Sequence, residues 1–260
     1  MRKILYILLA ILLLVLLYVQ KQAIYRAMPI KPSKAQVISK EKEIVPPEKE
    51  PFEPIGEHIV YTIKLGKVSL GTAIYDHLPR VDLKGKKVSC MTFETKLVRF
   101  NDLEKIYSDS KNFLPLRVER SISTWPFSEK ISEEYNQETF SLSIVKNKGK
   151  SKDERVIKKN SPIHNAILLP FYVRRQEALA VGWSMPANLP SMSFEIKLIS
   201  IEEIKVPAGA FKAYHFISKP ERFEIWITAD ERKIPILIRG TSGLGYTFLM
   251  KEYSIHPSKK

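Results

Sequence analysis

The chain has 260 residues, of which 44% are hydrophobic, so it can bury a sizeable core and a wholly disordered protein is excluded. Its 42 Lys and Arg outnumber 28 Asp and Glu, giving a formal net charge of +14, and its single cysteine excludes a disulfide-stapled scaffold. Such a charge is typical of nucleic-acid-binding proteins, but here it is spread along the chain without a helix-turn-helix or RNA-binding signature. We therefore expect no nucleic-acid partner.

Residues 1–21 predict a membrane anchor. Arg2 and Lys3 precede an unbroken apolar run from Ile4 to Val19, which as a helix is about 24 Å long. This is short for a hydrocarbon core of about 30 Å, but flanking polar side chains can complete the span. A cleaved signal peptide is the alternative, although no clean small-x-small cleavage site or lipidation cysteine follows the run. We expect Ile4 to Val19 to hold the chain in a membrane.

The charges that flank this apolar run do not indicate which of its ends faces the cytoplasm. Four basic residues between Lys21 and Lys34 rival those at the amino terminus. The short tail before a long hydrophobic run is typical of an export signal. We therefore expect a single-pass protein of an inner membrane with its C-terminal domain in the periplasm, and a cleaved, exported form is the alternative.

Residues 22–55 predict an extended linker. The stretch from Pro29 to Pro54 holds six of the chain's 17 prolines, many charged residues and no glycine. Such a segment buries too little apolar surface to fold, so we expect a semi-stiff spacer of up to about 80 Å. The first glycine, Gly56, marks the start of a folded domain at residues 56–254, which a disordered tail at 255–260 follows.

From Gly56 onward, apolar residues mostly alternate with polar ones, which predicts β-strands. Gly66 and Lys67 separate the first two strands, so a hairpin is expected there. The spacings leave no room for crossover helices, which favours antiparallel pairing. The predicted fold class is mostly β, a curved antiparallel sheet or partly open β-barrel. The predicted strands are 58–65, 67–78, 88–97, 113–121, 139–146, 193–200, 213–218, 223–228, 234–239 and 246–253.

The segment 161–183 breaks this pattern. Ser161 can cap a helix, Pro162 suits its first turn, and apolar residues then recur at four-residue spacing. Pro170 lacks an amide hydrogen and crowds the preceding turn, so we expect a helix kinked or restarted there and ended near Gly182. Its apolar stripe would cover one open face of the sheet.

A basic stretch runs from Lys146 to Lys159, with seven Lys or Arg around Gly149. A solvated hairpin tip is the first interpretation, contact with anionic lipid or a glycan the second, and contact with nucleic acid the third. The overall positive charge is best used in attraction to the anionic surface of a membrane.

No constellation of catalytic or metal-binding residues is evident in the sequence. The five histidines lie far apart without an H-E-x-x-H or H-x-H pair, and one cysteine provides no thiolate cluster. The glycines around Gly243 separate two predicted strands, which fits a hairpin turn and not a phosphate loop. Cys90 shares a predicted strand face with polar residues, so we expect it to be more exposed than a core cysteine. We predict no catalytic residue, metal or cofactor.

The aromatic residues are the most informative side chains. One interpretation is that they plug the ends of a curved sheet. The other is an apolar cleft between sheet and helix that holds a lipid or other hydrophobic ligand. The candidate cleft residues are Trp125, Phe127, Phe171, Tyr172, Trp183 and Trp226.

Several stretches resemble a known family. The turn V-P-A-G-A-F at 206–211, followed by Glu-Ile-Trp-Ile at 224–227, resembles the bacterial envelope family catalogued as domain of unknown function 3108. The opening residues 56–73 and L-P-L-R-V-E-R at 114–120 are also similar, so the resemblance covers about residues 56–254. It implies a secreted or membrane-tethered β domain with no assigned chemistry. The half-barrels of lipoprotein carriers are similar only as an analogy of fold.

The chain departs from the family at one point. Where the family is expected to place an Asp before its helix, this chain has His164 and Asn165. Any role that rests on that acid is therefore in doubt for this chain.

These observations favour a non-enzymatic, membrane-anchored periplasmic domain that binds an apolar envelope ligand or a lipid. One alternative is an envelope assembly or scaffold protein that recruits partner proteins through strand edges or the linker. A second is an envelope hydrolase acting on glycans or lipids. That activity requires paired carboxylates or a Ser–His pair that only the fold could bring together.

Overall fold

A computed structural model describes residues 53–149, 151–241 and 245–256. The predicted anchor and nearly all of the predicted linker lie outside these residues. Within the described ranges, no helix is long and apolar enough to cross a membrane. Apart from residues 190–192, the described residues belong to one compact unit, Glu50–Leu189 with Ser193–Lys260.

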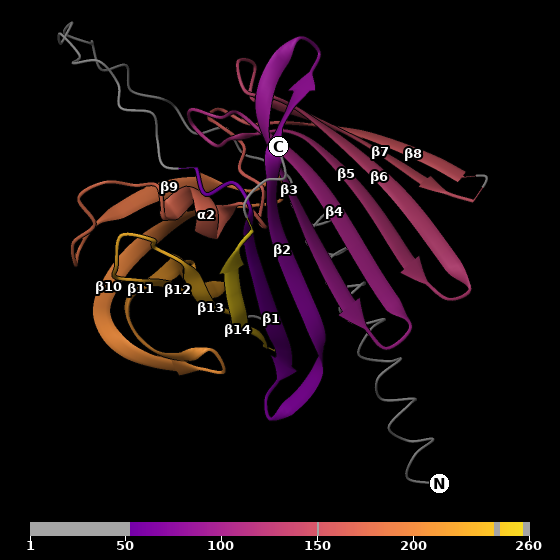
Figure 1. The fold of residues 1–260 in the computed structure, drawn as a ribbon. Coiled ribbons are helices and arrows are strands. Elements are labelled where there is room, and N and C mark those ends of the chain that lie inside the picture. The colour runs from indigo at the N-terminus through magenta and orange to yellow at the C-terminus, as the bar shows by residue number, and fades with distance from the viewer. Residues whose placement is uncertain (1–52, 150, 242–244, 257–260) are drawn as a thin grey trace, which may run out of the picture. The chain divides into compact units, whose positions relative to one another are not determined.

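The described chain forms one antiparallel sheet of 14 strands, which confirms the prediction of a mostly β, antiparallel fold (Figure 1). Strands adjacent in sequence pair with each other, except β8 and β9, and β1 also pairs with β14. The first and last strands therefore lie in the middle of the sheet, and its two edges are β8 and β9. Because these two edges are not paired, the sheet is open rather than a closed barrel.

The strands differ widely in length, and one short helix interrupts their succession. The first half of the sheet comprises β1 (Glu57–Leu65), β2 (Val68–Leu83), β3 (Lys86–Leu97), β4 (Phe100–Ser108), β5 (Pro115–Thr124), β6 (Phe127–Asn136), β7 (Ser141–Lys148) and β8 (Ser151–Lys158). After helix α2 (Leu169–Val173) come β9 (Ser184–Asn188), β10 (Ser193–Val206), β11 (Gly209–Lys219), β12 (Phe223–Thr228), β13 (Pro235–Gly240) and β14 (Tyr246–Ile255).

The core follows the alternation that predicted the strands. Along β1, Ile59, Tyr61 and Ile63 are buried and their neighbours are half-buried, as in a strand with one face against a core. The Tyr61 hydroxyl donates to the carbonyl of Pro235 at 2.8 Å, which satisfies its polar end inside the core.

A second apolar cluster lies on the other face of β3. Val88 and Cys90 are fully buried there, because a register shift after Leu78 lets Val81 and Leu83 of β2 pack over them. The expectation of a more exposed Cys90 is therefore wrong. Burial also raises the pKa of its thiol.

The prediction of a kinked covering helix over 161–183 is wrong. Helix α2 has five residues, with Pro170 in its first turn, and residues 161–168 are not helical. The side chain of Gln137 binds both the N–H and the carbonyl of Ile163. The Asn165 Oδ1 atom accepts hydrogen bonds from the backbone N–H groups of residues 167 and 168. Side-chain partners thus replace the helical hydrogen bonds that the sequence pattern predicts.

Candidate functional site

The antiparallel meander places successive turns at opposite ends of the sheet. We call one end the capped end, because α2 lies against it, and the other the rim (Figure 1). The capped end comprises residues 53–57, 77–89, 109–114, 169–175 and 229–234, and the rim comprises the turn residues 66–68, 98–100, 125–127 and 148–149.

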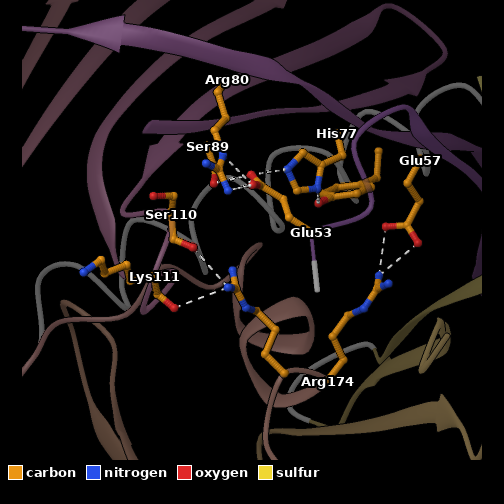
Figure 2. Close-up of polar contacts among 10 residues, drawn as sticks. Glu53, Glu57, His77, Arg80, Ser89, Ser110, Lys111 and Arg174 are labelled. Carbon is orange, nitrogen blue, oxygen red and sulfur yellow. Dashed lines mark hydrogen bonds and ion pairs between the residues drawn. The ribbon is translucent and has the colours of Figure 1, made fainter. Parts of the chain in front are cut away.

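Glu53 lies at the centre of a polar network at the capped end (Figure 2). Its carboxylate accepts hydrogen bonds from the Ser89 hydroxyl and from Arg80 Nε, and lies 3.1 Å from His77 Nε2. Burial alone would raise the pKa of this carboxyl. The hydrogen bonds from His77, Ser89 and Arg80 outweigh burial and lower the pKa from 4.5 to about 2.

Ser89, His77 and Glu53 have the residue types of a hydrolase but not its geometry. The Ser89 hydroxyl donates to Glu53, so it is not hydrogen-bonded to the histidine that would have to take its proton. Ser89 is fully buried and His77 is 2% exposed, which also keeps substrate away. The described residues contain no group of three or more His, Cys, Asp or Glu suited to a metal ion. The network therefore lacks the hydrogen-bond geometry of a Ser–His hydrolase.

An ion pair ties α2 to the sheet. Arg174, directly after α2, donates from Nη1 to both carboxylate oxygens of Glu57 at 3.0 and 2.8 Å, and from Nη2 to the carbonyl of Arg232 at 3.0 Å. The two side chains are 4% and 0% exposed. A pair this deeply buried is costly to break, because either partner alone leaves an uncompensated charge.

Arg175, the next residue, is only partly paired. Its Nη2 donates to the carbonyls of Ser110 and Lys111 at 3.1 and 3.3 Å. Its guanidinium lies 4.7 Å from the ring centre of Phe113. The Nη1 atom is buried and has no hydrogen-bond partner in the described part of the chain. Burial lowers the pKa of this guanidinium, because the charged form is desolvated.

Arg175 lines a cavity of about 10 Å³, which is room for about one water molecule. Tyr75, Phe113 and Phe171 form aromatic walls, and the rings of Tyr75 and Phe171 are stacked with centres 3.8 Å apart. Pro54, His77 and Arg174 complete the lining. The cavity therefore offers a cationic donor beside apolar walls, an arrangement that suits a single anionic oxygen.

The predicted cleft residues near α2 have different neighbours. Phe171 lines the cavity just described, whereas the adjacent Tyr172 packs edge-on against His164 with ring centres 4.9 Å apart. Trp183 packs edge-on against Phe216 at 5.9 Å. Of the six, the structure brings together Phe171 and Tyr172 on α2.

The other three predicted cleft residues lie elsewhere on the sheet. Trp226 is buried on β12 and stacks on His215 of β11 at 4.0 Å. Trp125 and Phe127 flank the β5–β6 turn of the rim and are 76% and 64% exposed. These two form a second pair, at the opposite end of the sheet from α2.

Several residues of the capped end were not predicted as functional. Glu53 stands in a proline-rich stretch that predicts a linker, and His77 and Ser89 stand on predicted strands. The adjacent residues Arg174 and Arg175 could have indicated a polar site here, because two cations directly after an apolar segment need either solvent or partners.

The comparisons with known proteins point to one family. The family model described as protein of unknown function DUF3108 matches residues 60–251, which confirms the resemblance drawn from the sequence. The chain is similar to a β-barrel-like protein of domain of unknown function DUF1849 from Brucella abortus, with 6% identity over 78% of this chain and 98% of that chain and a TM-score of 0.48. It is also similar to a protein with a YmcC-like fold from Bacteroides fragilis, with 11% identity over 79% of this chain and 100% of that chain and a TM-score of 0.27. No curated protein matches the chain.

Proposed function

The chain belongs to the DUF3108 family, whose function is unknown, and from its capped end we propose that it is a non-enzymatic, membrane-anchored periplasmic domain that binds an envelope amphiphile with an anionic headgroup. The anchor is the apolar run from Ile4 to Val19. One observation carries the ligand class, the buried and unpartnered Nη1 of Arg175 beside an aromatic-walled cavity.

The chemistry of Arg175 favours an anionic oxygen. A buried donor without a partner costs free energy, and the cost is larger for a charged group. Arg174 beside it is already neutralised by Glu57, so Arg175 is the cation available to a ligand at this cavity. Because the cavity has room for only one water-sized group, a headgroup oxygen fits inside it and an acyl chain would lie outside it.

The same lining favours binding over chemistry. Among the residues around the cavity, His77 is held by Glu53 and lies 3.5 Å from the Tyr75 hydroxyl. Neither side chain stands beside an accessible nucleophile, so the described lining holds a group in place without a means of cleaving it.

The proposal is tested with octyl phosphate as probe and octanol as its neutral counterpart. The full chain, kept soluble in an amphipathic polymer, is titrated with each while its thermal midpoint is followed. We expect a saturable rise with octyl phosphate only. The Arg175→Gln variant should weaken this binding about tenfold or more, since a charge-assisted hydrogen bond is lost.

The matched control is Arg222→Gln, which removes one exposed arginine between β11 and β12 and should leave the response to octyl phosphate unchanged. Equal responses of wild type and Arg175→Gln would contradict the proposed ligand site. A response to octanol as strong as that to octyl phosphate would contradict the anionic headgroup.

A second candidate function is the recruitment of a partner protein along the β8 edge. β8 is exposed along nearly its whole length and pairs on one side only. Its run of charges from Lys152 to Arg155 discourages indiscriminate strand addition and would select a partner of complementary charge. Photocrosslinking from Val156 in membranes tests this, because a scaffold gives discrete protein adducts and a ligand-binding domain gives none.

A further inference from the structure

The rim carries four large apolar side chains that are exposed to solvent. Val68 is 63% exposed, Val98 77%, Trp125 76% and Phe127 64%. They belong to the β1–β2, β3–β4 and β5–β6 turns, which Figure 1 shows at the same end of neighbouring strands. Apolar side chains exposed together in a row mark an interaction surface.

The turns at the opposite end lack this feature. Residues 84–85, 109–114 and 137–140 form the β2–β3, β4–β5 and β6–β7 turns. None of these described residues is a large apolar side chain exposed to this degree, and Phe113 among them is 3% exposed. Exposure of large apolar side chains is therefore not a general property of the hairpin turns of this sheet. Among the turns compared, it distinguishes those of the rim, while elsewhere exposed apolar residues such as Ile255, 52% exposed at the end of β14, stand singly.

Basic side chains are interleaved with the aromatic rings of the rim. The Arg99 guanidinium lies 5.9 Å from the ring centre of Trp125, and Lys148 Nζ lies 5.7 Å from that of Phe127. These two contacts join the β3–β4, β5–β6 and β7–β8 turns into one continuous strip. Lys67 adds a cation in the β1–β2 turn, and the turn residues 66–67, 98–99, 125–126 and 148–149 include no acid.

We propose that the rim docks on the surface of a lipid bilayer that contains anionic phospholipid. Tryptophan favours the membrane interface, where its apolar ring leaves water and its N–H still finds a partner. Arg99 and Lys148 stand beside the rings at the level where headgroup phosphates lie, and the net charge of +14 favours approach.

Two further features favour a bilayer as the occupant of this surface. A hairpin tip presents its side chains while the flanking strands remain paired, so insertion of the tip leaves little backbone without a partner. The aliphatic Val68 and Val98 extend the exposed strip beyond the aromatic rings. Such side chains enter hydrocarbon readily, whereas they offer no stacking surface to the bases of a nucleic acid.

This inference goes beyond the proposed function and is independent of Arg175, which lies at the other end of the sheet. A chain that binds octyl phosphate need not dock through its rim, and a chain that docks through its rim need not bind octyl phosphate. Failure of one proposal is therefore distinguishable from failure of the other.

Tryptophan quenching by brominated phospholipid tests the docking. The chain has three tryptophans, and Trp125 is the highly exposed one, since Trp226 is buried and Trp183 is half-buried. The full chain is reconstituted in vesicles of brominated phosphatidylcholine with and without phosphatidylglycerol. We expect strong quenching with the anionic lipid. Trp125→Phe should remove at least about half of the quenched emission, and the matched control Trp183→Phe should retain it.

Charge reversal tests the role of the cations. Arg99→Glu combined with Lys148→Glu should reduce the quenching about tenfold, because two attractive charges become repulsive. Lys205→Glu combined with Lys212→Glu makes the same change in net charge at exposed positions of β10 and β11, and should leave the quenching unchanged. Thermal midpoints of all variants show that the sheet is intact.

Three results would overturn the inference. The first is equal quenching in wild type and Trp125→Phe. The second is equal quenching with and without phosphatidylglycerol. The third is a blue shift of Trp125 emission that depends on protein concentration and not on bromine, which would assign the rim to a second copy of this chain.

Discussion

The two ends of this sheet treat charged and apolar side chains in opposite ways. The capped end buries ionised groups, with Glu57 at 1% and Arg174 at 5% exposure, whereas the rim exposes Trp125 and Phe127. The usual distribution of residues is inverted at both ends. Both inversions cost free energy in an isolated domain, so the buried ion pair marks where the fold is held together and the exposed rings mark where the domain meets another surface.

The contacts at the two ends also differ in range. The ion pair between Arg174 and Glu57 joins residues 117 positions apart, and so ties the end of α2 to the start of β1. The rim is built from hairpin turns whose partners are close in sequence. Breaking the ion pair of the capped end should therefore reduce stability, whereas changing the exposed side chains of the rim should reduce binding to a bilayer and leave stability unchanged.

Breaking the ion pair should have the largest effect. Arg174→Met removes the partner of the buried Glu57 carboxyl group, so we expect the free energy of unfolding to fall by about 3–5 kcal/mol. Urea unfolding of the full chain in detergent, followed by tryptophan fluorescence, measures this. The double variant Glu57→Gln with Arg174→Met should recover part of the lost free energy of unfolding. A loss below about 1 kcal/mol in Arg174→Met alone would show that the ion pair does not hold α2 against the sheet.

Two glycines, one at each end of the sheet, differ in the space around them. Gly56 at the capped end has φ +88°, and a Cβ there would lie 1.9 Å from the carbonyl oxygen of His256. Gly66 at the rim has φ +56° with open space around it. Gly66→Ala should cost about 1–2 kcal/mol for its left-handed backbone, and Gly56→Ala about 3 kcal/mol or more because of the added clash. Equal losses in thermal unfolding would contradict a tight closure at Gly56.

The pH dependence of stability tests the Glu53 network. Glu53→Gln should cost about 1–3 kcal/mol at neutral pH. Since the folded pKa is lowered from 4.5 to about 2, this stabilisation is present above pH 4.5 and is lost as the pH falls toward 2. The difference between wild type and variant in urea midpoints should therefore close across that window. A difference that stays constant down to pH 2 would contradict the role of the Glu53 carboxylate.

Changes at the rim should have the smallest effect on stability. Trp125→Ser combined with Phe127→Ser removes exposed side chains, so the free energy of unfolding should change by no more than about 0.5 kcal/mol. The predicted anchor is kept in an amphipathic polymer, so that the vesicles are bound through the rim alone. Under this condition the double variant should cosediment less with anionic vesicles than the wild type does. A large loss of stability would show that these rings pack in the core of the domain.

The strands were predictable where one face is consistently apolar, as in β1 and β12. β4 and β6 were missed because Asp102, Glu104, Glu129 and Glu133 occupy buried positions, and an acid at an inward position breaks the apolar alternation. The pairing of β1 with β14 joins the two ends of the domain, and no local pattern encodes it. The helix was overestimated because Gln137, distant in sequence, binds the backbone at Ile163.

For the candidate sites, the sequence indicated which residue types are involved but not where in the fold they lie. Trp125 and Phe127 were correctly expected near a turn, yet they were grouped with Phe171, which the antiparallel order of the strands puts at the other end. The polar cluster around Glu53 depends on the β2–β3 register and its shift between Leu78 and Val81, which leaves no signal in the residues themselves.

If one end of the sheet maintains the fold while the other docks on the bilayer, amide hydrogen exchange should respond to lipid at one end only. The full chain is compared in nanodiscs of phosphatidylcholine with and without phosphatidylglycerol. We predict that the anionic lipid slows exchange in the turns at 66–68, 98–100 and 125–127, and leaves residues 109–114 and 169–175 unchanged. Slowed exchange at the capped segments without any change at the rim turns would contradict the claim.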